Sequence, residues 1–273
     1  MNLTEIEIQE TIERILSAPK YRDLGLNTHT ITQLIHQEAL NQPSQKGLLK
    51  SVRRKLHNIV APYLGEPDYE KLIEQLSELQ DTSLESKEVR SFCQNILSQH
   101  ASTAERLPNL DVFYNQLFQK TGKPNTILDL ACGLHPIGFP FMGLPLSTRY
   151  YAYDIIQPRI DFINTFFIKL GLAPLAENRD ILVSPPSIHA DLGLFFKEAH
   201  RFEKRTPGCN RSFWAHLDVD ILAVSLPVVD LSGKHNLTDR HRRLIQENLP
   251  QNHGVFEMLI ENEIIFLISQ PGK

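Results

Sequence analysis

Between residues 126 and 154 the sequence has two short hydrophobic segments that carry carboxylates. One carboxylate lies within the first segment, and another ends the second segment. The first segment, Thr126-Ile-Leu-Asp-Leu-Ala-Cys-Gly-Leu-His-Pro136, runs through Asp129 into a turn at Gly133. The second segment ends in Asp154, which stands 21 positions after Gly133. A glycine turn lets the backbone approach a ligand closely, and an acidic residue about 20 positions later can accept hydrogen bonds from both ribose hydroxyls. This spacing is typical of a site for a nucleotide-type cofactor.

A third carboxylate, Asp180, follows the next expected strand, where it can accept a hydrogen bond from an adenine amino group. Its neighbour Ile181 can cover the base. A dinucleotide site would need further glycines in a G-x-G-x-x-G turn to cradle a pyrophosphate, and Gly133 has no second glycine at the required offset. The segment therefore favours S-adenosylmethionine, which carries no phosphate. Asp129 is then placed to meet the amino group of that cofactor, directly or through water.

The sequence shows no clear group that would activate an acceptor atom. Ser184-Pro-Pro-Ser187 is similar to the Asn/Asp-Pro-Pro-aromatic motif of amine methyltransferases, but it precedes the fourth expected strand and lacks the aromatic residue. We interpret it as a rigid loop, and Cys132 as a small packing residue rather than a nucleophile. A ring nitrogen such as guanine N7 already has a lone pair and loses no proton on methylation. Transfer to it needs only positioning and a site that tolerates the resulting cation.

The elements that position these residues alternate between strands and helices after about residue 105. Short hydrophobic segments predict strands at 126–131, 150–154, 191–196, 220–226, 255–260 and 264–268. Alternation with helices predicts a mainly parallel sheet. Only Glu261-Asn-Glu263 separates the last two segments, which is too short for a parallel crossover and predicts an antiparallel hairpin. We therefore predict an α/β, Rossmann-like class I methyltransferase domain over residues 105–273.

The preceding part, residues 1–104, is predicted to be an all-α domain. Hydrophobic residues recur at helical spacing in five segments, at 8–16, 31–35, 48–59, 72–79 and 92–97. Thr4 and Glu7 predict a capping box for the first helix. Thr28 or Thr30 is expected to cap the second helix, and the third is expected to end near Pro62.

The composition is that of an ordinary globular protein of 273 residues, with 41% hydrophobic residues and a net charge of −4. No stretch approaches the roughly 20 apolar residues that span a bilayer, so we expect no membrane association. The three cysteines, Cys93, Cys132 and Cys209, have no metal-type spacing. We therefore expect no metal site and no disulfide framework, and a cytoplasmic location.

Five runs of sequence match one known family: His100-Ala-Ser-Thr-Ala-Glu-Arg-Leu-Pro-Asn-Leu-Asp111, Leu128-Asp-Leu-Ala-Cys-Gly-Leu-His-Pro136, Asp191-Leu-Gly-Leu-Phe-Phe-Lys197, Ser225-Leu-Pro227 and Asn262-Glu-Ile-Ile-Phe-Leu-Ile268. Together they resemble the 16S rRNA (guanine-N7) methyltransferases of the aminoglycoside-resistance type (Arm/Rmt, FmrO-like), over nearly the whole chain. The resemblance implies methyl transfer from S-adenosyl-L-methionine to N7 of decoding-site guanine 1405, with S-adenosyl-L-homocysteine as product. It also implies the assembled 30S subunit as substrate and aminoglycoside resistance as the result. No feature demands a dimer, so we expect a monomer.

The resemblance also implies residue roles. Arg106 is similar to the arginine that reaches the methionine carboxylate, and no general base is expected. Lys197 and Ser225 are candidates for positioning the target. The full set expected to bind the cofactor is Arg106, Asp129, Ala131, Gly133, Asp154, Ile155, Asp180, Ile181 and Lys197.

Basic residues gather in three parts of the chain and predict contacts to rRNA phosphates, which salt should weaken. One window, from Lys46 to Gly65, contains no acidic residue, and helical spacing places four of its cations on one side. A solvated helix face is the alternative interpretation, and the family resemblance favours RNA. The set expected to contact RNA is Lys20, Arg22, Lys46, Lys50, Arg53, Arg54, Arg201, Lys204, Arg205 and Lys234.

Three positions depart from the family pattern. His135 stands where the family usually has Asn, and Asp230 stands where it has arginine. After Lys197 the family has a Leu-Leu-Pro stretch, whereas this sequence reads Glu198-Ala-His200. His200 and Asp230 lie near the expected target side. Two alternatives therefore stay open: methylation of a different RNA nucleotide, or a catalytically degenerate homologue that binds rRNA or the ribosome.

Overall fold

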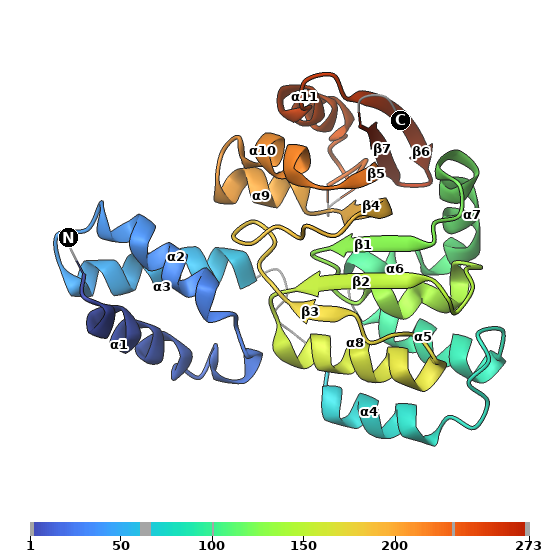
Figure 1. Ribbon diagram of the computed structural model, residues 1–273, viewed down its shortest axis with the longest axis horizontal. Coiled ribbons are helices and arrows are strands. Elements are labelled where there is room, and N and C mark those ends of the chain that lie inside the picture. The colour runs from blue at the N-terminus through green and yellow to red at the C-terminus, as the bar shows by residue number, and fades with distance from the viewer. Residues whose placement is uncertain (1–2, 61–66, 100, 231–232, 271–273) are drawn as a thin grey trace.

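The protein is described by a computed structural model that covers residues 3–60, 67–99, 101–230 and 233–270 (Figure 1). A helical unit at the N-terminus stands beside a sheet with helices on both faces. The unit consists of α1 (Glu5–Leu16), α2 (Thr28–Ala39) and α3 (Gln45–Val60), with a 3₁₀ turn at Arg22–Leu24. Its own hydrophobic core contains Ile15, Ile31 and Val52, which are fully buried.

The N-terminal helices begin where side chains cap them. The Thr4 hydroxyl accepts a hydrogen bond from the backbone of Glu7, and the Glu7 carboxylate accepts from the backbone of Thr4, which confirms the capping box. The expectation for α2 was wrong, because the side chain of Asn27 caps it by accepting from the backbone of His29. Asn is as good an N-cap as Thr. The expected role of Pro62 lies outside the described residues.

Four further helices, α4 to α7, precede the sheet: Tyr69–Glu78, Lys87–Ser98, Ala101–Ala104 and Leu110–Thr121. They do not share the core of α1–α3. Leu76, Ile96 and Leu117 instead belong to a hydrophobic cluster that includes Ile127 of the first strand. In the described part of the chain before residue 105 every regular element is helical, as predicted.

The sheet has seven strands in the order β3-β2-β1-β4-β5-β7-β6. Their bounds are Thr126–Leu130, Arg149–Asp154, Ala176–Asn178, Ala190–Phe196, Val219–Pro227, Gly254–Ile260 and Glu263–Ser269 for β1 to β7. The first five strands are parallel, and β7 runs antiparallel to β5 and forms a hairpin with β6. The predicted fold class is confirmed, including the terminal hairpin.

Successive strand residues point to opposite sides of the sheet. Both faces of this sheet are hydrophobic, and helices cover both. In β1, Ile127 packs into the cluster shared with α8 (Gln157–Leu170), whereas Leu128 packs into the cluster shared with α9 (Ala199–Arg205) and α10 (Cys209–His216). The final helix, α11 (Thr238–Asn248), lies on the α10 side. Because β1 to β5 are all parallel, their carboxyl ends lie at one edge of the sheet.

The segment after β1 differs from the α-helix expected there. It forms a 3₁₀ stretch at His135–Phe141, with Pro136 at its start and Pro140 inside. Proline lacks a backbone N–H and clashes with the preceding turn, which prevents a regular α-helix. All three cysteines are buried and free. No described helix has the length and apolar character needed to cross a membrane.

Candidate active site

The carboxyl ends of β1 and β2 open into a cavity of about 840 Å³. Ala131, Asp154 and Ile181 line the side formed by the sheet, and α3 contributes Arg54 and Ile59 opposite them. The volume lies within the range of roughly 300–1,000 Å³ that is usual for small-molecule sites. The cavity therefore brings together residues predicted for the cofactor and residues predicted for RNA.

Asp154 is held rigidly on the cavity wall. Its Oδ2 accepts hydrogen bonds from the backbone N–H of Gly133 (3.0 Å) and from Nη1 of Arg159 (2.7 Å). Its Oδ1 accepts from the backbone of Ile156 at 3.1 Å. Gly133 has a φ of 54°, a left-handed conformation that glycine adopts without strain. A carboxylate oxygen has two lone pairs, so Oδ1 keeps one for a ligand hydroxyl.

Asp180 also lines the cavity, but its carboxylate already accepts four hydrogen bonds from three residues. Arg205 of α9 donates to both oxygens, at 3.0 and 2.6 Å. Thr30 of α2 donates to Oδ2, and the backbone of Leu182 donates to Oδ1. An adenine amino group would have to compete with these donors. Arg205, predicted to contact RNA, forms an ion pair with Asp180 instead.

Arg106 lies outside the wall of this cavity in a buried ion pair. Its Nε and Nη2 donate to the two carboxylate oxygens of Glu263 at 2.7 and 2.6 Å, and Nη2 also donates to Ser225. The guanidinium stands 4.6 and 4.4 Å from the ring centroids of Phe113 and Phe196. Nη1 makes none of these polar contacts. Sequence reasoning missed Glu263, and it placed Ser225 at the target, whereas the structure buries Ser225 completely against Arg106.

Glu263 remains ionised because cations surround it. Burial alone would raise the pKa of this carboxyl, but the Arg106 charge and hydrogen bonds, together with Lys197, lower it to about 2. Nζ of Lys197 lies 3.2 Å from Glu263 and 2.6 Å from Glu105. The backbone of Lys197 is left-handed, with a φ of 62°, at the end of β4. Lys197 is thus committed to carboxylates of the protein.

Asp129 and His135 belong to a buried hydrogen-bonded chain. Oδ2 of Asp129 accepts from the hydroxyl of Tyr150 at 2.7 Å and lies 2.8 Å from Nδ1 of His135. Nε2 of His135 lies 2.8 Å from the hydroxyl of Tyr114. His135, the first departure from the family pattern, therefore links Tyr114 of α7 to Asp129 of β1. Oδ1 of Asp129 is the oxygen that makes none of these contacts.

The residues predicted to contact RNA separate into exposed and paired groups. Lys20, Arg22, Lys46, Lys50, Arg54, Lys204 and Lys234 are exposed. Arg53 donates to the backbone of Arg14, and Arg201 pairs with Glu198. Arg54, Arg201 and Lys204 line the cavity. The structure thus brings cations of α3 and α9, about 150 positions apart in the sequence, to one opening.

Asp230, where the family pattern predicts arginine, closes a turn. Its Oδ1 accepts hydrogen bonds from the backbones of Lys234 and His235. It does not line the cavity. Lys234, whose backbone donates to Asp230, is exposed.

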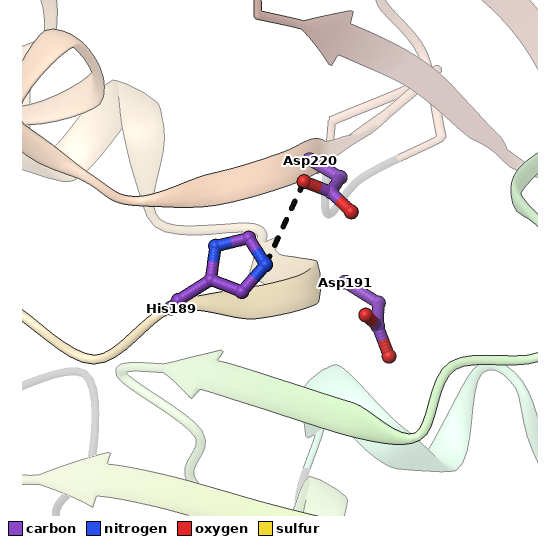
Figure 2. A group of neighbouring side chains, drawn as sticks. All are labelled: His189, Asp191 and Asp220. Carbon is purple, nitrogen blue, oxygen red and sulfur yellow. Dashed lines mark ion pairs between the residues drawn. The ribbon is translucent and has the colours of Figure 1, made fainter. Parts of the chain in front are cut away.

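One group of side chains in the described residues has spacing suited to a cation. Figure 2 shows His189, Asp191 and Asp220, whose ligand atoms lie within 4.8 Å of one another. They stand at the amino ends of β4 and β5, the edge opposite the cavity. Asp191 accepts hydrogen bonds from the backbones of Asn125 and Thr126. These contacts account for its position without a metal.

Comparisons with known proteins place the chain beside one group of enzymes. The family described as "Ribosomal RNA methyltransferase (FmrO)" matches residues 17–254. A 16S rRNA (guanine(1405)-N(7))-methyltransferase of Micromonospora echinospora is 31% identical over 229 residues, 81% of this chain and 82% of that protein. The structure of the 16S rRNA methylase RmtB is 26% identical, with a TM-score of 0.80 over 96% of this chain and 98% of its own. The 16S rRNA methyltransferase RmtF, solved with S-adenosyl-L-homocysteine, is 25% identical, with a TM-score of 0.81 over 98% of this chain and 100% of its own.

Proposed function

We propose that this chain, which belongs to the ribosomal RNA methyltransferase (FmrO) family, transfers a methyl group from S-adenosylmethionine to N7 of guanine 1405 in 16S rRNA. One observation carries the proposal: Asp154, fixed by Gly133 and Arg159, lies on the wall of a cavity at the carboxyl edge of the sheet. This is where ligands of such sheets bind. The relatives named for this reaction cover four fifths of the chain.

The donor set of the site fits this cofactor. Oδ1 of Asp154 has a lone pair for a ribose hydroxyl, and Ile155 and Ile181 give apolar surface for an adenine ring. We assign Nη1 of Arg106 to the methionine carboxylate and Oδ1 of Asp129 to the amino group, because these atoms are left over in otherwise committed side chains. The two carboxylates and the guanidinium would hold a charged amino acid and an uncharged nucleoside without a phosphate site.

The reaction needs little more from the protein than alignment. When bound, the cofactor supplies an electrophilic methyl group on a sulfonium. The bond from sulfur to methyl breaks as the bond from guanine N7 to methyl forms, the sulfur keeps the electron pair, and no proton moves. The protein's task is to hold the two atoms in line and to exclude water, which together account for much of the rate in such reactions.

We further propose that the substrate is the assembled 30S subunit, that the enzyme acts as a monomer in the cytoplasm, and that methylation confers aminoglycoside resistance. Support comes from the exposed cations of α3 and α9 at the mouth of the cavity. Arg54 and Lys204, which line the cavity, and Lys50, which is exposed on α3, would contact phosphates around the guanine. On this view the α1–α3 unit docks on folded RNA.

The test is incubation of the purified protein and small subunits with labelled S-adenosylmethionine, followed by mapping of the modified nucleotide. Label at N7 of guanine 1405 is the expected result. Label on another nucleotide would refute the target assignment, and label on free rRNA alone would refute the assembled substrate. Calorimetric titration with S-adenosylmethionine supplies the second arm. Binding of small subunits without cofactor binding or label would support the degenerate homologue. The specific observation for this alternative is that the Asp180 carboxylate already accepts four hydrogen bonds.

A further inference from the structure

His200 is a cavity residue that the proposed chemistry does not yet use. It is the second residue of α9, four positions after the end of β4, and it lines the same cavity as Ala131 and Asp154. The loop after a strand's carboxyl end is where an acceptor approaches a ligand held in a parallel sheet. His200 is therefore on the side where the target base must enter.

The imidazole of His200 is neutral at physiological pH. Burial lowers its pKa to about 4, with help from the neighbouring charges of Arg201, Lys204 and Arg240 and from His241. The two histidine rings lie 6.2 Å apart between centroids, and burial also lowers the pKa of His241. A neutral imidazole carries one N–H and one lone pair, so its tautomer decides what it can recognise.

The surroundings of the two ring nitrogens select the tautomer. Nδ1 of His200 is enclosed by protein and has no hydrogen-bond partner, whereas Nε2 is not enclosed in this way. An enclosed N–H without an acceptor is rarer and costlier than an enclosed lone pair. The proton therefore belongs on Nε2, which makes this nitrogen a donor toward the cavity.

We propose that Nε2–H of His200 donates a hydrogen bond to O6 of the target guanine and so sets the base specificity of the enzyme. Guanine presents O6 and N7 side by side as acceptors, while adenine presents an amino donor in place of O6. A donor at this point accepts guanine, repels adenine and leaves N7 free for the methyl group. Because the imidazole is neutral, it adds no positive charge against the cation that forms on N7. The assignment rests on the proposed function, and it concerns a side chain that departs from the family pattern.

An isosteric pair of variants tests the assignment. His200→Asn retains an N–H donor, and His200→Leu has nearly the same shape without one. With small subunits and labelled S-adenosylmethionine, His200→Leu should lose roughly tenfold in kcat/KM, and His200→Asn should recover most of that loss. The affinity of both variants for S-adenosylhomocysteine, measured by calorimetry, should equal that of the unaltered protein. His189→Asn, an exposed histidine at the opposite sheet edge, is the matched control and should change neither quantity.

Each other outcome overturns the assignment. Full activity of His200→Leu would show that no donor is needed, and equal losses in both variants would point to packing. A loss of S-adenosylhomocysteine affinity in step with activity would place His200 at the cofactor instead. The unaltered protein separates the two levels of inference: if it transfers no label, the proposed function fails first, whereas label from it with an active Leu variant refutes His200 alone.

Discussion

Replacing Glu263 with Gln should destabilise the protein strongly, because this carboxylate neutralises an almost completely buried guanidinium, that of Arg106. Both side chains are about 5% exposed, and the pair is bidentate with distances of 2.6 and 2.7 Å. Removing one partner of such a buried pair leaves an uncompensated charge and costs about 3–5 kcal/mol of unfolding free energy. Equilibrium denaturation in urea at pH 7 measures this loss. Lys197 adds to it, because it loses its contact with the same carboxylate.

The pH dependence follows from the direction of the Glu263 shift. The folded pKa of about 2 lies below the ordinary value of 4.5, so the pair's contribution is complete above pH 4.5 and is lost as the pH falls toward 2. The stability difference between the two proteins should therefore shrink in acid. A difference that stayed constant from pH 7 to pH 3 would contradict the assigned cause.

Glu257→Gln is the matched control for this prediction. Glu257 lies on the adjacent strand β6 and makes an equally short bidentate pair with Arg242, but both side chains are more than a third exposed. Solvent screens exposed pairs, so the control should lose much less stability.

The Glu263 variant should also bind S-adenosylhomocysteine more weakly while retaining its affinity for 5′-methylthioadenosine, which lacks the carboxylate assigned to Arg106. Equal stability losses at 257 and 263 would refute the reasoning.

Three further changes test the remaining parts of the site. Asp154→Asn should weaken S-adenosylhomocysteine binding at least tenfold in calorimetry, because the amide is no longer a charged acceptor and Arg159 loses its ion pair with this side chain; unchanged affinity would remove Asp154 from the ribose site. Lys50→Gln and Arg54→Gln should each lower affinity for small subunits and reduce the salt slope of binding by about one, and an unaltered slope would mean that neither side chain meets a phosphate. Burial raises the pKa of Cys209 to about 11, so a thiol reagent at pH 8 should modify this side chain slowly in the native protein and rapidly in denaturant. Rapid native modification would contradict its burial.

The sequence predicted those features that local pattern determines. Alternation of hydrophobic segments with turns identified the parallel strands, and the three-residue gap Glu261–Glu263 identified the hairpin. The position of Asp154 at the end of β2 followed from the spacing to Gly133, and the structure joins these two residues by a hydrogen bond. Such relations fit within one β-turn-helix unit, where residue spacing and geometry are directly linked.

Partners that lie far apart in the chain could not be predicted in this way. Glu263 meets Arg106 across 157 positions, and Thr30 meets Asp180 across 150. Nothing in the local sequence around Arg106 indicates a carboxylate partner, because the pairing depends on β7 lying beside β5. The three residues of β3 are likewise too few to give a hydrophobic period, and Asp180, which follows this strand, lines the cavity.

The contacts of Thr30 and Asn27 bear on how docking and cofactor binding relate. Asn27 donates to the backbone of Asn178, and Thr30 donates to Asp180, so two residues at the start of α2 fasten the helical unit to the segment after β3. The same unit presents Arg54 to solvent and Ile59 to the cavity. RNA bound by the exposed cations of α3 would therefore contact a unit that also contributes to the cavity wall and donates a hydrogen bond to Asp180. The helices are part of the wall of the site, and a rigid-body shift of α1–α3 would move Thr30, one of the donors to Asp180.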